Sequence, residues 1–229
     1  MEIDISLEDY FKELDLMDKQ YGQEEELYPL VNMILRANYN FEKEGLSLRD
    51  VHNHNSTKMK HSLLYGYAGF SDLVILGRDY CPDEDYHNIN KHVEKMYGCV
   101  EIKTSVADIE NLNEGYNKRY INGSQVIGQL AWYGKTIYTN GYMWRYLELD
   151  ESGVKRLDFP KVPVKDKNEN IKGFSLGRGS RKFHFRVKTI CNLNEDKQLT
   201  DENKKQWNCL KQNLKKIDWT KPNNFDKFL

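Results

Sequence analysis

The sequence lacks the features that mark membrane, secreted and motor proteins. No apolar run approaches the ~20 residues that a helix needs to cross a bilayer. The acidic start, MEIDISLEDYFKELD, has no basic segment followed by an apolar stretch, and no GxxxxGK[ST] loop is present. With 39% hydrophobic residues and only 5 prolines in 229 positions, the chain has the composition of a globular protein. We expect a cytoplasmic protein that has no membrane partner and no helicase motor.

Cysteine is scarce and its spacing shows no pattern. None of the four cysteines has a CxxC partner: Cys81, Cys99, Cys191 and Cys209. This spacing argues against a disulfide framework and against a structural zinc site, and it predicts reduced thiols.

The histidines also lack a regular metal-ligand spacing. His52, His54 and His61 fall in the polar segment 52–61, and we interpret them as solvated loop residues. A zinc site formed by Cys81, His87 and His92 in the insertion that follows is the weaker alternative.

Net charge gives no sign of a nucleic-acid partner, because the formal value is −1. Its distribution is more informative. Residues 172–188 contain six cations and no acid: Lys172, Arg178, Arg181, Lys182, Arg186 and Lys188. This stretch is typical first of an exposed strand pair and nearly as much of a phosphate-contacting surface, for which Arg181 and Lys182 are the substrate-binding candidates.

Hydrophobic periodicity predicts helices and strands in alternation. Residues 27–35 place four apolar side chains on one helical face, with Pro29 near the helix start. Residues 69–76 and 99–104 are short apolar runs typical of strands, separated by a polar insertion that reads as a surface loop. Residues 124–135 predict a second amphipathic helix, with Ser124 as its N-cap.

The second half of the chain adds strands and one helix. Asn140 and Gly141 lie between two β-prone runs, which is the strongest short-range signal for a hairpin. Residues 156–162 and 182–190 are further strand candidates, and 201–216 predicts a polar helix. We therefore expect a single α/β domain over 1–229, with a mixed central sheet flanked by helices. Its core spans about 23–150, and a C-terminal β/α extension spans about 151–229.

Charged residues on the two central strands point to metal chemistry. Alternation along a strand places Glu101 and Lys103 on one face and turns Ile102 toward the core. Asp72 belongs to the neighbouring strand, and pairing of the two strands would bring its carboxylate beside Glu101. Two clustered carboxylates repel unless a cation joins them, and hard oxygen ligands favour Mg²⁺ or Mn²⁺. Such a site suits phosphodiester hydrolysis, with Lys103 orienting or activating the attacking water.

These residues resemble a known signature. Gly69-Phe70-Ser71-Asp72 followed by Glu101-Ile102-Lys103 is similar to the D…ExK motif of the PD-(D/E)XK nuclease superfamily. The resemblance implies a restriction-endonuclease-like core and a metal site made by Asp72, Glu101 and Ile102, with Lys103 catalytic.

The resemblance extends to the flanking helices. It implies a further catalytic acid on the first helix, for which Glu24 is the first candidate and Glu25 the second. The run Gln129-Leu130-Ala131-Trp132-Tyr133 resembles the QxxxY motif of this superfamily. This likeness makes Gln129 a catalytic candidate and Gln125 and Tyr133 substrate-binding candidates. The alternatives are that both glutamines lie on the solvent-exposed face of an amphipathic helix and that Tyr133 packs in the core.

The resemblance spans about 23–150. It includes a strand pair similar to the one in the nuclease domains of type I restriction enzymes. It implies a Mg²⁺-dependent DNA endonuclease in host defence or restriction. Cleavage of RNA by the same chemistry is a second possibility. A non-catalytic nucleic-acid-binding or assembly module is a third, and the intact Asp72, Glu101 and Lys103 argue against it. Small nucleases often pair to cut both strands of a duplex, so a homodimer is expected.

Overall fold

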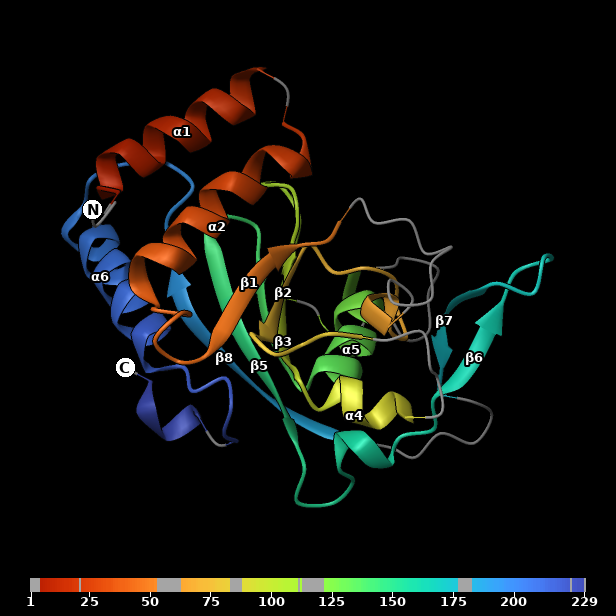
Figure 1. Ribbon diagram of the computed structural model, residues 1–229. Helices are drawn as coiled ribbons and strands as arrows, with labels where there is room; N and C mark the ends of the chain where they lie inside the picture. The colour runs from red at the N-terminus through yellow and green to blue at the C-terminus, as the bar shows by residue number, and fades with distance from the viewer. Residues whose placement is uncertain are drawn as a thin grey trace.

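The computed structural model describes residues 5–20, 22–52, 63–82, 88–110, 112, 122–176, 183–222 and 224–228. These residues form an α/β fold in which helices cover both faces of a mixed six-stranded sheet (Figure 1). The expected mixed central sheet with flanking helices is therefore confirmed. No helix in these ranges is long and apolar enough to span a membrane.

The central sheet has the strand order β1-β2-β3-β4-β5-β8. The strands are β1 (Leu46–Asp50), β2 (Leu73–Gly77), β3 (Met96–Ile102), β4 (Lys135–Thr139), β5 (Met143–Asp150) and β8 (His184–Asn192). Of the strand pairs that the structure describes, only β3 and β4 run parallel. A parallel pair needs a crossover connection, which contains α5 (Asn122–Tyr133). The carboxyl ends of β3 and β4 therefore meet at one edge of the sheet.

Successive residues of each central strand face opposite sides of the sheet, so they pack against different helices. Leu73, Ile75, Val100 and Ile102 share a core with three helices: α1 (Leu7–Gln20), α2 (Leu27–Asn38) and α6 (Asp201–Lys216). On the other face, Val74, Leu76 and Cys99 pack against Trp132 and Tyr133 of α5. Figure 1 shows α1, α2 and α6 on one side of the sheet and α5 on the other. Both faces are buried, so Glu101, which alternates with Val100 and Ile102, lies on the α5 face.

Short helices and one small sheet complete the fold. The helices are the 3₁₀ turns η1 (Glu24–Glu26), η4 (Arg156–Asp158) and η5 (Phe225–Lys227) and the short α4 (Ile89–Val93). Strands β6 (Val162–Lys165) and β7 (Ile171–Ser175) form a separate two-stranded sheet.

Several sequence expectations are met at the level of single elements. Pro29 lies in the first turn of α2, where its missing N–H removes no intrahelical hydrogen bond. Gly141 takes a positive φ of 90° in the turn between the antiparallel strands β4 and β5, so the hairpin prediction is correct. Helix α6 has the predicted bounds, and the Thr200 side chain caps it by accepting from Asn203 N.

Other expectations fail for identifiable reasons. Helix α5 begins at Asn122, so Ser124 lies inside the helix and is not its N-cap. The run 156–162 is not a strand: it begins with η4, because the Arg156 guanidinium donates to the main-chain oxygens of Val93, Met96 and Tyr133. The polar insertion is more than a loop, since it contains α4 with a buried Val93.

Candidate functional site

Three of the predicted residues meet at the edge where β2 begins and β3 ends. Asp72 directly precedes β2, Glu101 is the penultimate residue of β3, and Lys103 follows that strand. Leu73 pairs with Val100, so one further step of the register sets Asp72 opposite Glu101. The Ile102 N–H donates to Asp72 Oδ2 across the two strands at 2.6 Å. Regular antiparallel pairing therefore brings the two carboxylates together.

Lys103 joins this pair from the same face of β3. Its Nζ donates to Glu101 Oε1 at 2.6 Å and lies 3.6 Å from Glu24 Oε2. Only 8% of the Lys103 side chain is exposed, and the Glu101 side chain is fully buried. The structure thus places Glu24, which η1 holds in front of α2, in the same cluster as the three residues of the two strands.

Tyr28 is a member of the cluster that sequence reasoning missed. Its hydroxyl donates to Glu24 Oε1 at 3.1 Å. The same hydroxyl lies beside Asp72, and this contact favours the ionised form of that carboxyl. Tyr28 follows Glu24 by four residues, which is the spacing at which side chains on a helix are neighbours. That spacing could have revealed it.

Burial and mutual repulsion shift the titration of the two carboxyls. Burial, followed by the charge of Asp72, raises the pKa of Glu101 to about 8. Burial raises the pKa of Asp72 to about 6, although the Ile102 N–H and Tyr28 act in the opposite direction. Burial would lower the pKa of Lys103, but the charge of Glu101 and its hydrogen bond, with the charges of Glu24 and Asp72, leave it raised. These contacts favour the ammonium form of Lys103, and burial favours the protonated form of each carboxyl.

The donor set suits a hard divalent cation. Glu101 Oε2 and Gln129 Oε1 are buried and have no hydrogen-bond partner among the described residues. Asp72 and Glu101 supply carboxylate oxygens. Ile102 has a buried, apolar side chain without a ligand atom, so it can contribute only its main-chain carbonyl. No group of three or more His, Cys, Asp and Glu side chains in the described ranges could hold a metal. A cation held by two carboxylates would keep several waters in its shell, as Mg²⁺ does.

The two polar residues of α5 occupy different surroundings. Gln129 is fully buried, donates from Nε2 to Phe70 O at 3.3 Å, and lowers the pKa of Glu101. Gln125, one turn earlier, is partly exposed. Gln129 thus borders the carboxylate cluster, while Gln125 lies nearer to solvent.

Tyr133 is placed in the core and not at a surface. Its ring is 1% exposed, and its hydroxyl donates to Leu64 O at 2.7 Å. The structure gives it a packing role beneath the site, which is the alternative that the sequence left open. Glu24 contacts the cluster through Lys103 and Tyr28, whereas Glu25 makes no hydrogen bond or ion pair with the described residues of the cluster.

The remaining candidates lie elsewhere. Arg181 and Lys182 fall outside the described residues, as do His54, His61 and His87. His52 is paired with Asp50 and packs edge-on against Tyr28, with ring centroids 4.7 Å apart. It is therefore not a freely solvated loop residue.

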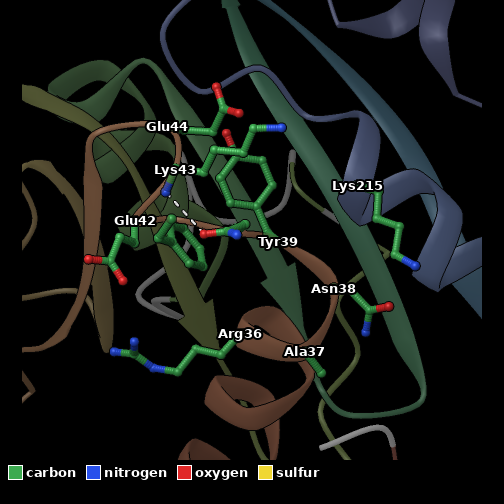
Figure 2. A pocket seen from close by; sticks show the side chains of 10 residues that line it. Arg36, Ala37, Asn38, Tyr39, Glu42, Lys43, Glu44 and Lys215 are labelled. Atoms are coloured by element: carbon green, nitrogen blue, oxygen red, sulfur yellow. Dashed lines mark hydrogen bonds between the residues drawn. The ribbon is translucent and has the colours of Figure 1, made fainter. Parts of the chain in front are cut away.

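One hollow in the described part of the chain lies away from these carboxylates. It has a volume of about 580 Å³ and lies between the C-terminal end of α2, the residues leading into β1, and Lys215 of α6 (Figure 2). Arg36 on its wall donates to Asn32 and to Leu48 O, and Asn38 donates to Ile34 O. None of the candidate catalytic residues lines it.

No protein-family model matches the chain, and neither a curated protein nor a solved structure is significantly similar to it. Inference about function therefore depends on the residues and geometry of the site.

Proposed function

We propose that this chain is a Mg²⁺-dependent nuclease that hydrolyses phosphodiester bonds in DNA. The observation that carries the proposal is the buried cluster of Asp72, Glu101 and Lys103, in which Glu101 Oε2 and Gln129 Oε1 have no partner among the described residues. Two carboxylates with raised pKa values are costly to hold together, and a divalent cation offsets that cost. Mn²⁺ has the same ligand preference and is the alternative metal.

Each residue has a distinct role in this proposal. Asp72, Glu101 and the Ile102 carbonyl would hold the metal, which when bound polarises a phosphate oxygen and lowers the pKa of the attacking water. As an ammonium, the form that its acidic neighbours favour, Lys103 would donate a hydrogen bond that orients the water and stabilises charge on the phosphate. Glu24 forms a second ion pair with the Lys103 ammonium and helps to hold it in place. Gln129 lies against Glu101 and restrains its orientation.

The likeness to PD-(D/E)XK nucleases supports this assignment. In order along the chain come Glu24 before a helix, Asp72 at a strand start, Glu101 and Lys103 at the next strand end, and Gln129 on the crossover helix. We propose that the mixed sheet is a restriction-endonuclease-like core on this basis. The C-terminal region takes part in it, because β8 pairs along the whole length of β5.

Cleavage assays on purified protein test the proposal. Supercoiled plasmid, linear duplex, single-stranded DNA and RNA are each incubated with Mg²⁺, Mn²⁺ or EDTA. We expect plasmid and duplex cleavage that EDTA abolishes and that Asp72→Asn, Glu101→Gln and Lys103→Met each remove. Lys43→Ala, an exposed lysine at the far end of the sheet, is the matched control. Cleavage of RNA alone would favour the alternative substrate, and unchanged cleavage by Lys103→Met would refute the mechanism.

Two further features belong to the proposal. A duplex has two strands and the chain offers one such cluster in its described part, so we expect a homodimer on DNA, measurable by sedimentation with and without duplex. A non-catalytic nucleic-acid-binding module would bind DNA in the same assays without cutting it.

A further inference from the structure

The strands β6 and β7 form a ribbon that stands apart from the central sheet. Figure 1 shows it projecting from the body beyond α5. Every residue of β6 is exposed, and Val162 and Val164 retain 49% and 44% of their accessible surface. A two-stranded hairpin is marginally stable alone in water, and this one gains little from packing along β6. Exposed apolar side chains on such a ribbon favour a role in binding.

The ribbon is firmly held at its base. Phe174 N donates to Gly66 O at 2.9 Å, and the Phe174 ring stacks on Trp132 with centroids 5.1 Å apart. Gly173 leaves no room for a side chain, because a Cβ there would lie 2.2 Å from Tyr65 Cδ1. The base is therefore fixed on α5 and on the segment before β2.

The same contacts lead to the carboxylate cluster. Tyr65, which packs on Gly173, also meets Phe70 edge-on, with centroids 5.1 Å apart. Phe70 O accepts the hydrogen bond from Gln129, and Asp72 is two residues further along the chain. The base of the ribbon is thus connected through Tyr65 and Phe70 to the segment that carries Asp72.

The far part of the ribbon carries more cations than acids. Lys165, Lys167 and Lys172 are exposed, and the two acids of the same hairpin are Asp166 and Glu169. Each acid has a partner within the hairpin. Asp166 accepts from the main-chain N–H groups of Asn168 and Asn170 and so builds the turn. Glu169 pairs with Lys165 at 2.8 Å, and such an exposed pair is weak enough to exchange for a phosphate.

The edge of β6 is unsuited to a protein partner that adds a strand. Pro163 lacks the N–H that an added strand would need, and Lys165 places a charge on the same short edge. A two-stranded ribbon has the width of the DNA major groove, where lysines reach phosphates and small apolar side chains contact thymine methyl groups.

We propose that the β6–β7 ribbon is an arm that binds duplex DNA in its major groove, next to the carboxylate cluster. This inference rests on the proposed function. Lys165, Lys167 and Lys172 contact phosphates, and Val162 and Val164 lie against the base edges.

The test measures binding of a labelled 30-bp duplex by fluorescence anisotropy, with Ca²⁺ in place of Mg²⁺. The variant Lys165→Ala/Lys167→Ala/Lys172→Ala is compared with Lys204→Ala/Lys205→Ala/Lys215→Ala on α6, which lies on the opposite side of the molecule (Figure 1). We expect the ribbon variant to bind about 10- to 100-fold more weakly and its salt slope to fall by about two to three, since each phosphate contact contributes about 0.9. The three lysines changed to arginine should restore affinity.

The outcomes separate the ribbon from the nuclease. If wild type binds and cleaves DNA while the ribbon variant matches the α6 control in affinity and salt slope, the arm is refuted and the nuclease stands. If wild type binds duplex through the ribbon without cutting it, the arm stands and the nuclease is refuted. If wild type binds no nucleic acid, both the arm and the nuclease are refuted. Equal losses on single-stranded and duplex DNA would overturn the major-groove assignment.

Discussion

Lys103 Nζ lies 2.6 Å from Glu101 Oε1, while Oε2 of the same carboxylate is buried without a hydrogen-bond partner among the residues that the structure describes. One oxygen of Glu101 is thus neutralised by a cation of the chain, and the other is left for a second positive group. A buried acceptor without a partner carries a desolvation cost of about 1–3 kcal/mol. A bound metal would remove that cost.

The first prediction separates metal binding from catalysis. Glu101→Gln keeps the shape of the side chain and removes its charge, so we expect Mg²⁺ or Mn²⁺ affinity to fall at least about tenfold. Lys103→Met leaves both carboxylates, so metal should still bind while cleavage falls by about 10²- to 10⁴-fold. Isothermal titration calorimetry measures the metal affinity, and cleavage rates measure catalysis. Glu148→Gln, a buried glutamate on β5 that accepts from Asn224 N, is the matched control and should bind metal normally.

The second prediction concerns Tyr28. Removal of its hydroxyl in Tyr28→Phe takes a hydrogen bond from Glu24 and a stabilising contact from Asp72, without changing the packing of the ring. A hydrogen bond to a charged group contributes about 1.5–3 kcal/mol, so we expect about a tenfold loss in cleavage with a smaller loss in metal affinity. Tyr97→Phe, at the other end of β3, should match wild type. A Tyr28→Phe enzyme with wild-type rates at all metal concentrations would exclude a positioning role.

The third prediction follows from the raised pKa values of Asp72 and Glu101, about 6 and about 8. Metal binds the ionised carboxylates, so protons and metal compete for the site. Apparent Mg²⁺ affinity should rise from pH 6 to pH 8, by up to about tenfold per pH unit for each proton released, and level off above that range. Calorimetry in buffers of different ionisation enthalpy measures the released protons. Glu101→Gln should show a shallower dependence, and pH-independent affinity in wild type would contradict the assignment.

The central strands and their charged ends were predictable from the sequence because period-two alternation is a local property. Leu73, Val74, Ile75 and Leu76 form a continuous apolar run, as strands buried on both faces do. Once they pair, Glu101 must face the α5 side, and Asp72 must lie across from it. Helix α1 also has a local signal in the sequence, because Leu7, Tyr10, Phe11 and Leu14 recur at helical spacing and are all buried.

Other features depend on contacts between segments that are distant in the sequence, so no local sequence pattern predicts them. The η4 turn forms where a strand pattern was expected, because the Arg156 guanidinium binds carbonyls more than twenty residues away. The pairing of β8 with β5 joins segments separated by the whole β6–β7 ribbon. The approach of Tyr28 to Asp72 requires the first turn of α2 to lie beside the start of β2, and only the packed structure fixes that geometry.

The fourth prediction concerns stability and involves Lys135, at the start of β4 and far from the carboxylates. Its Nζ donates to Asp218 O and Trp219 O, and burial lowers its pKa from 10.5 to about 8. The folded state therefore binds fewer protons than the unfolded state between these values, so the free energy of unfolding should rise with pH. Relative to Lys135→Met, wild type should gain about 1–2 kcal/mol from pH 7 to pH 9.5. Urea unfolding in EDTA measures this gain, because groups common to both proteins cancel in the difference. Parallel pH profiles for the two proteins would show that the Lys135 ammonium is not destabilised by burial.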